Sequence, residues 1–169
     1  LLYIIILASC ISCALPQFSF KSAGKGNQKE IAAETLQIDF FENSSALASS
    51  SVSVSFTESL RDLMLAQTSL ALVSDTGDVV FTGSIKKYSI TPINIQAGSE
   101  TAAQNRLTMV VSVNEYFPKI DSFPLNNQNF SAFVDYNSSE DFNSIEENLI
   151  ETLNNQLTQD IFDKAFGGE

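Results

Sequence analysis

The chain lacks histidine altogether, and its only two cysteines, Cys10 and Cys13, stand close to the N-terminus. Histidine is the commonest general base and the commonest metal ligand in proteins, so its absence removes the usual routes to acid–base and metal chemistry. A Ser-His-Asp triad cannot be built, and neither can a zinc site of histidine and cysteine ligands. The composition therefore predicts a protein that is not an enzyme, with no catalytic residues, no metal and no cofactor.

Carboxylate chemistry is the one catalytic route that these absences leave open. Two pairs of acidic residues are candidates for it, Asp39 with Glu42 and Asp75 with Asp78. Each pair also suits a strand end or a turn, where short polar side chains satisfy the backbone. We favour these structural roles for all four residues.

Positive charge is also scarce. Nine lysines and arginines stand against 20 aspartates and glutamates, which gives a net charge of −11. Such a field repels nucleic acids, so the sequence predicts no nucleic-acid partner. Hydrophobic residues make up 44% of the 169 positions and charged residues only 17%, a composition that supports one packed domain.

An apolar run opens the chain, and it ends at Leu7-Ala8-Ser9-Cys10. The run is shorter than the roughly 20 residues that cross a bilayer, and it has the length of a signal-peptide core. The last four residues resemble a lipobox, the site where bacterial lipoproteins are cleaved before a lipidated cysteine. We expect residues 1–9 to be a signal peptide truncated at its start, residues 10–33 a lipidated N-terminus and flexible tether, and residues 34–169 a single domain.

Resemblance to bacterial lipoproteins implies an S-diacylglycerol group on Cys10 and an N-acyl chain on its amino group. Several acyl chains make a stable anchor, since each buried methylene contributes about 0.8 kcal/mol. Cleavage before Cys13 is the alternative, but it would put Cys10 where an aliphatic residue is expected, so Cys10 is favoured. Two other interpretations remain open: a redox Cys-x-x-Cys motif, and a secretory signal on a protein glycosylated at its Asn-x-Ser triplets.

Alternating apolar residues predict five strands. They are centred on residues 36–41, 70–73, 79–90, 107–114 and 130–136. The alternation changes parity near Lys86 and Lys87, which predicts a β-bulge. Prolines and asparagines between residues 118 and 127 predict a loop before the last strand.

Two stretches instead show helical spacing. The first helix is expected to begin between Ser50 and Ser55, with Ser55-x-x-Glu58 as a capping box. Its buried face would carry Leu60, Leu63 and Met64.

The second helix is predicted from about residue 142 to the glycines at 167 and 168, with apolar residues three or four positions apart. Ser144-x-x-Glu147 is its expected capping box. The order β-α-β-β-β-β-α favours an α+β fold, a two-layer α/β sandwich in which a small mixed or antiparallel sheet packs against two helices.

Several segments resemble the lipopolysaccharide-assembly lipoproteins, the LptE-like family. They are residues 56–62 (FTESLRD) in the first helix, 101–108 (TAAQNRLT) at the start of a strand, 135–139 (DYNSS) before the second helix and 161–165 (IFDKA) near its end. The resemblance extends from about residue 18 to residue 166. It implies a non-catalytic lipoprotein on the periplasmic side of the outer membrane of a Gram-negative bacterium. Such proteins plug the β-barrel translocon LptD, help it to assemble and assist delivery of lipopolysaccharide to the cell surface.

Some members of that family are thought to contact lipopolysaccharide through basic residues, although this chain is strongly acidic. Lys86, Lys87 and Arg106 are the candidates for such contacts, because we expect them at strand ends that flank one hairpin loop. The simpler interpretation of each is a solvated surface cation. A free-standing envelope lipoprotein that binds a small ligand or another envelope protein is the alternative function.

Overall fold

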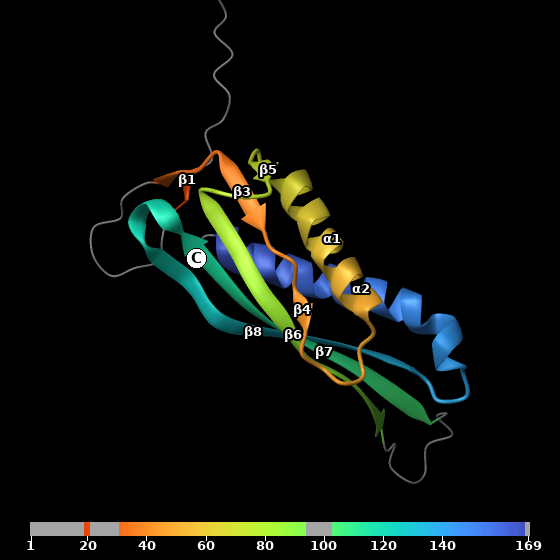
Figure 1. Cartoon of the computed structure of the whole chain (residues 1–169). Helices are drawn as coiled ribbons and strands as arrows, with labels where there is room; N and C mark the ends of the chain where they lie inside the picture. Colours follow the sequence, from red (N-terminus) through yellow and green to blue (C-terminus); the bar gives the residue numbers. More distant parts are fainter. Residues whose placement is uncertain (1–18, 21–30, 94–102, 168–169) are drawn as a thin grey trace, which may run out of the picture.

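A computed structural model of the chain describes residues 19–20, 31–93 and 103–167. The main body has two layers, a six-stranded sheet and two helices that lie together on one side of it (Figure 1). The elements of this body are β3 (Thr35–Ile38), β4 (Glu42–Asn43), α1 (Ser50–Gln67), β5 (Ala71–Val73), β6 (Val79–Ile93), β7 (Gln104–Phe117), β8 (Ser122–Asn137) and α2 (Phe142–Phe166). Two further strands, β1 (Ser19–Phe20) and β2 (Ile31–Ala32), pair with each other in a separate two-stranded sheet.

The main sheet is mixed, with the strand order β5-β3-β6-β7-β8 and with β4 beside β6. β3 runs parallel to both β5 and β6, whereas β6, β7 and β8 form an antiparallel meander. Parallel neighbours need a crossover connection, and α1 supplies it between β3 and β5. The predicted α+β sandwich is therefore confirmed, and the parallel pairing belongs to its short N-terminal strands.

The core lies between the sheet and the helices. Leu107, Met109, Val111 and Val113 alternate along β7 and are fully buried, which confirms the period-two pattern of this strand. From the helices come buried residues spaced by three or four positions: Val52, Phe56, Leu60 and Met64 on α1, and Leu153, Leu157 and Ile161 on α2. Leu63, expected among them, is only half buried.

The predicted β-bulge is confirmed. Ile85 lies opposite Val111 while Lys87 lies opposite Val110, so Lys86 is the additional residue in β6. The bulge returns the strand to the correct parity, because Ile85 and Tyr88 are both buried although they are three positions apart.

Both predicted capping boxes are wrong. α1 begins at Ser50 after the N-cap Ser49, so Ser55 lies inside the helix. α2 begins at Phe142, and the side chain of its N-cap Asp141 accepts a hydrogen bond from the backbone N–H of Asn143. The predicted start of α2 near residue 142 is confirmed, and at this position Phe142 packs against the Tyr136 ring at 5.8 Å between ring centroids. The predicted end of α2 is confirmed by its C-cap Gly167.

The loop expected over residues 118–127 is also wrong. Only a short 3₁₀ helix, Pro118–Ile120, and Asp121 separate β7 from β8, so Pro124 and Asn127 lie within β8. β8 is an edge strand of this sheet, where proline is tolerated because one side of the strand has no ladder to lose. The pairing of this part of β8 with β7 is irregular: it contains two register shifts, and Asn127 has a positive φ of 47°.

No helix among the described residues is long and apolar enough to cross a membrane.

Candidate functional surface

The sheet has one face that neither helix covers. On β6, β7 and β8 this face carries the residues that alternate with the core positions, and we call it the outer face. Its middle is mostly polar and uncharged, formed by Thr82, Ser84, Asn114, Asn129 and Ser131 together with Val110 and the buried Ser112. A polar face of this kind can be exposed to water and can also form hydrogen bonds with a partner surface.

Arg106 stands at one end of the outer face, directly opposite Asp135 of β8. Its Nε and Nη2 atoms donate to the two carboxylate oxygens at 2.7 and 2.8 Å, and its guanidinium lies 3.8 Å from the centroid of the Phe133 ring. The hydrogen bonds from Arg106 lower the pKa of the Asp135 carboxyl. The positive charge of Arg106 is thus balanced within the protein, while the Phe133 ring remains 50% exposed.

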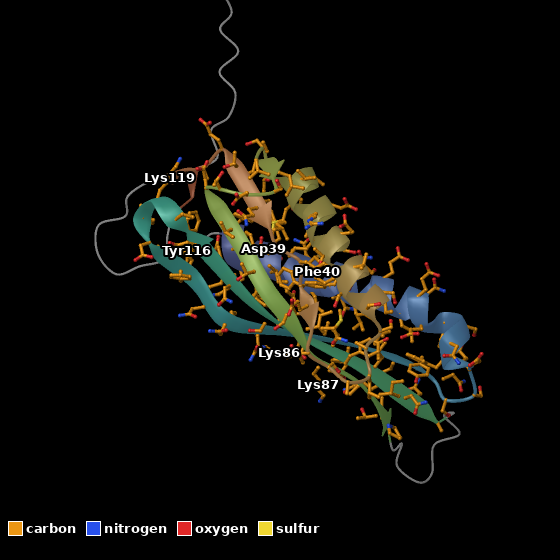
Figure 2. The ribbon with its side chains drawn as sticks, in the orientation of Figure 1. Asp39, Phe40, Lys86, Lys87, Tyr116 and Lys119 are labelled. Atoms are coloured by element: carbon orange, nitrogen blue, oxygen red, sulfur yellow. The ribbon has the colours of Figure 1, made fainter. Side chains whose placement is uncertain are left out.

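Lys86 and Lys87 lie at the bulge of β6, and Figure 2 shows both side chains pointing away from the helices. Both residues are exposed. The expectation that they stand at a strand end is wrong, because β6 continues to Ile93. Arg106 lies opposite Thr91, four residues beyond Lys87 and thus about 14 Å along the strand. The structure therefore separates Arg106 from the two lysines, and the contact of these three residues with lipopolysaccharide stays a prediction.

A second aromatic group stands at the other end of the outer face, where β7 turns into β8 (Figure 2). The rings of Tyr116 and Phe123 stack at 4.4 Å between centroids, and the Tyr116 hydroxyl donates to Asp121 at 3.3 Å. Phe123 is 51% exposed. The outer face thus has exposed aromatic rings at both ends of a polar centre, and aromatic residues are enriched in protein interfaces.

Glu115 was not singled out from the sequence, yet its surroundings in the described structure are unusual for a carboxyl group. It belongs to the core face of β7, opposite Phe81 of β6 and Leu125 of β8, and only 1% of its surface is exposed. Neither carboxylate oxygen has a hydrogen-bond partner. Burial raises the pKa of this carboxyl from 4.5 to about 8. The alternation of β7 was the signal that could have found it. Every second position from 107 to 117 faces the core without a break, so position 115 is expected to be buried.

Asp78 joins three segments at the start of the sheet. Its Oδ2 accepts from the backbone N–H groups of Glu34 and Thr35 at 2.9 and 3.1 Å, and its Oδ1 lies 2.7 Å from Nζ of Lys119. Burial acts to raise its pKa, but the hydrogen bonds from Lys119, Glu34 and Thr35 prevail and lower it to about 2. This carboxylate is therefore committed to holding β3, β6 and the β7–β8 turn together.

Of the other acidic candidates, Glu42 is an exposed residue of β4, and the remaining two have local partners. Asp39 accepts a hydrogen bond from Nε2 of Gln37 at 2.8 Å, and Asp75 accepts from the backbone of Thr76 at 2.8 Å. Within the part of the chain that the structure describes, no group of three or more cysteines, aspartates or glutamates could hold a metal ion. Cys10 and Cys13 lie outside the described residues.

Comparison with solved structures shows the class of fold to which the chain belongs. The fold is similar to that of a minor lipoprotein from Acinetobacter baumannii, with a TM-score of 0.51, 12% identity, and coverage of 81% of this chain and 95% of the other. It is also similar to a protein from Xanthomonas campestris, with a TM-score of 0.52, 10% identity, and coverage of 79% and 85%. At these identities the likeness concerns the fold alone, a small α/β domain found in bacterial lipoproteins. No curated relative matches the chain.

Residues 33–165 match the family model described as Lipopolysaccharide-assembly, LptE. The chain belongs to this family. The match covers α1, every strand of the main sheet from β3 to β8, and all of α2 except its last residue. The family is one of non-catalytic, envelope-associated lipoproteins, and it acts in lipopolysaccharide assembly together with LptD.

Proposed function

We propose that this protein is a lipid-anchored lipoprotein of the outer membrane that plugs the β-barrel translocon LptD, helps it to assemble and thereby assists lipopolysaccharide delivery to the cell surface. The family match over residues 33–165 carries this proposal. Its role is one of binding rather than catalysis, since the candidate carboxylates Asp39, Asp75 and Asp78 already have structural partners.

The outer face suits contact with a barrel wall. A barrel interior is polar, and the centre of the outer face offers hydroxyl and amide groups with few charges. The aromatic rings of Phe123 and Phe133 at its ends are each half exposed. Packing of this kind depends on shape and hydrogen bonding, so the net charge of −11 does not oppose it.

Co-purification tests the plug. A tagged chain extracted in mild detergent should bring down a barrel of far larger mass, identified by mass spectrometry. Ser84→Arg places a long charged side chain on the outer face and should lower recovery of the barrel roughly tenfold, a change of about 1.4 kcal/mol. Asp62→Arg on the exposed side of α1 is the matched control and should leave recovery unchanged. Recovery of the wild-type lipoprotein without a barrel would refute the proposal.

The anchor is tested separately with radiolabelled palmitate. We expect Cys13→Ala to incorporate the label and remain membrane-bound, and Cys10→Ala to lose both properties, because the lipobox ends at Cys10. The opposite pattern would move the anchor to Cys13. Failure of both wild-type and Cys13→Ala proteins to take up palmitate would remove the anchor from the proposal.

Direct contact with lipopolysaccharide is proposed for Lys86 and Lys87 first, because both are exposed and neither lies in an ion pair among the described residues. Arg106 is proposed second, since its guanidinium is already bonded to Asp135. Binding of purified lipopolysaccharide should fall when both lysines are changed to glutamine. Equal binding by wild-type and double-variant proteins would exclude this role.

A further inference from the structure

The two edges of the main sheet differ in length. One edge is β5, with only three residues, and the other is β8, with 16. Within residues 19–20, 31–93 and 103–167, β7 is the only strand that pairs with β8. Exposed edge strands attract other strands, and proteins usually prevent this by making them short, charged or bulged. β5 follows the first of these rules, whereas the length of β8 needs another explanation.

The direction of the backbone groups of β8 follows from its hydrogen bonds. The N–H of Ser138 donates to the carbonyl of Ala103 at 3.0 Å, which makes this the hydrogen-bonded type of antiparallel pair. The preceding residue, Asn137 at the end of β8, is of the other type, whose backbone groups point away from β7: its N–H donates to the Glu140 carboxylate, and its carbonyl accepts from the Glu140 N–H. Along an antiparallel ladder, hydrogen-bonded pairs alternate with pairs whose backbone groups point away from the neighbouring strand.

This alternation identifies the free backbone groups. From Gln128 to Asn137 the register with β7 is continuous, so every second residue directs its N–H and carbonyl to the open edge. These residues are Asn129, Ser131, Phe133 and Asp135. They span about 20 Å, the length over which a strand of six or seven residues could pair.

Little in this stretch blocks pairing. Pro124 and the register shifts lie outside it, toward the start of β8. Its only charged residue is Asp135, whose carboxylate is already bonded to Arg106 on the outer face. The stretch is therefore regular, extended and nearly uncharged at its free side.

An open hollow runs beside this edge, between residues 131–133 of β8 and α2. Gln156 and Asp160 are among the residues of its helical wall. Alternate side chains of an added strand would enter the hollow, as they do in other cases of strand addition. α2 carries five acidic residues, Glu146, Glu147, Glu151, Asp160 and Asp163, against the single basic residue Lys164.

We propose that the free edge of β8 is a docking site for an extended, basic segment of a partner polypeptide, which pairs with residues 129–135 as an additional antiparallel or parallel strand. The exposed backbone groups supply affinity, and the acidic α2 selects lysine or arginine at alternate positions of the segment. A second copy of this chain is disfavoured, because two bodies of net charge −11 repel each other. The edge site uses the backbone of these β8 residues, whereas the plug is proposed to use the side chains of the outer face, and the peptide experiment below involves no barrel, so its result is separate from that of the plug.

Hydrogen exchange observed by NMR tests the proposal with a defined probe. The ¹⁵N-labelled chain in mild detergent is mixed with a ten-residue peptide that alternates lysine and valine. We expect the amides of Asn129, Ser131, Phe133 and Asp135 to exchange at least about tenfold more slowly, because only these gain partners. The amides of Ala132 and Val134 are already bonded to β7 and should change little. A peptide with glutamate in place of lysine should give no protection.

Two variants make the test specific. Ser131→Pro removes one free N–H and obstructs the edge without taking a bond from β7, so it should abolish binding of the lysine peptide. Ser131→Ala, which keeps the N–H, should bind like wild type. If Ser131→Pro does not fold, Asp160→Asn on the exposed surface of α2 replaces it, and it should weaken binding about twofold at low salt.

Three results would overturn the proposal. The first is no protection of the alternate amides by the lysine peptide. The second is equal protection by lysine and glutamate peptides, which would remove the charge selection. The third is slow exchange of these four amides before any peptide is added, which would mean that the edge is already covered by this chain or by a second copy.

Discussion

At the residue scale, Glu115 shows how a carboxyl can be kept in a core without a partner. Its pKa of about 8 lies above neutral pH, so the group is mostly protonated inside the folded protein at pH 7. In the unfolded chain the same group ionises near 4.5. Between these two values the unfolded state releases a proton that the folded state keeps, and folding loses about 1.4 kcal/mol for each pH unit.

The first prediction is that Glu115→Gln raises the free energy of unfolding by about 4 kcal/mol at pH 7.5 and has little effect at pH 4. The reason is that the amide cannot ionise in either state. Urea denaturation across pH 4 to 8.5 measures the difference. Glu147→Gln, an exposed change on α2, should keep the wild-type pH dependence. A wild-type protein whose stability is flat over this range would refute the role of Glu115.

The pKa of Asp78 is shifted in the opposite direction to that of Glu115. Its pKa of about 2 lies below the usual 3.8, because the bonds from Lys119, Glu34 and Thr35 outweigh the effect of burial. The stabilisation is therefore complete above about pH 4 and is lost as the pH falls toward 2.

The second prediction is that Asp78→Asn lowers the free energy of unfolding by about 2 kcal/mol at pH 7, and that the two proteins converge near pH 2. Asp62→Asn on the exposed side of α1 is the control and should change stability by less than about 0.5 kcal/mol. Denaturation curves at pH 7 and pH 2.5 give the comparison. An Asp78→Asn deficit that persists at the lower pH would assign the effect to packing.

At the scale of the elements, the contact between β6, β7 and the segment after β3 depends on a single glycine. A Cβ at Gly83 would collide with the carbonyl oxygen of Ser112 on β7 and with the Phe41 ring. Phe41 is fully buried and meets Phe56 of α1 edge to face, at 5.2 Å between ring centroids. Gly83 therefore lets the Phe41 ring approach the backbone of β6, where the ring also contacts Phe56 of α1.

The third prediction is that Gly83→Ala costs about 2–3 kcal/mol of stability, since the collision involves backbone and a packed ring. Ser84→Ala, the neighbouring change on the outer face, should cost less than about 0.5 kcal/mol. Thermal unfolding measures both. Because Phe41→Leu would free part of the space, the double variant Gly83→Ala with Phe41→Leu should lose less than the sum of the two single changes.

Strands and helices were largely predictable from local pattern, whereas the helix N-caps and the start of β8 were not. The bulge in β6 follows from the parity of Ile85 and Tyr88, which can be counted in the sequence. The start of α2 near residue 142 was also predicted, but its N-cap is Asp141 rather than Ser144. The extension of β8 through Pro124 depends on its being at an edge, which only the strand order reveals.

At the scale of the whole molecule, net charge and the free β8 edge act in opposite directions. Unpaired backbone along residues 129–135 favours pairing between copies, and a net charge of −11 disfavours it. Salt shortens the range of the repulsion to about 8 Å at physiological ionic strength but leaves backbone hydrogen bonds nearly unaffected.

The fourth prediction is that self-association of the purified chain, although weak, increases when sodium chloride is raised from 20 to 500 mM. Sedimentation velocity at several protein concentrations measures it. Ser131→Pro should remain monomeric at both salt concentrations, because its edge cannot pair. Association that weakens with salt would show that attraction between charges, rather than the sheet edge, brings the copies together.

The sequence by itself determined the class of fold, the main helices and strands, the lack of histidine chemistry and the resemblance to the LptE family, because periodicity and composition are local properties. Only the tertiary structure decided that Glu115 is buried without a partner, that Arg106 is bonded to Asp135 and lies apart from Lys86 and Lys87, and that β8 forms a long free edge. The physical reason is that burial, charge pairing and strand order depend on residues distant in the chain, and these meet only when the sheet and the helices pack.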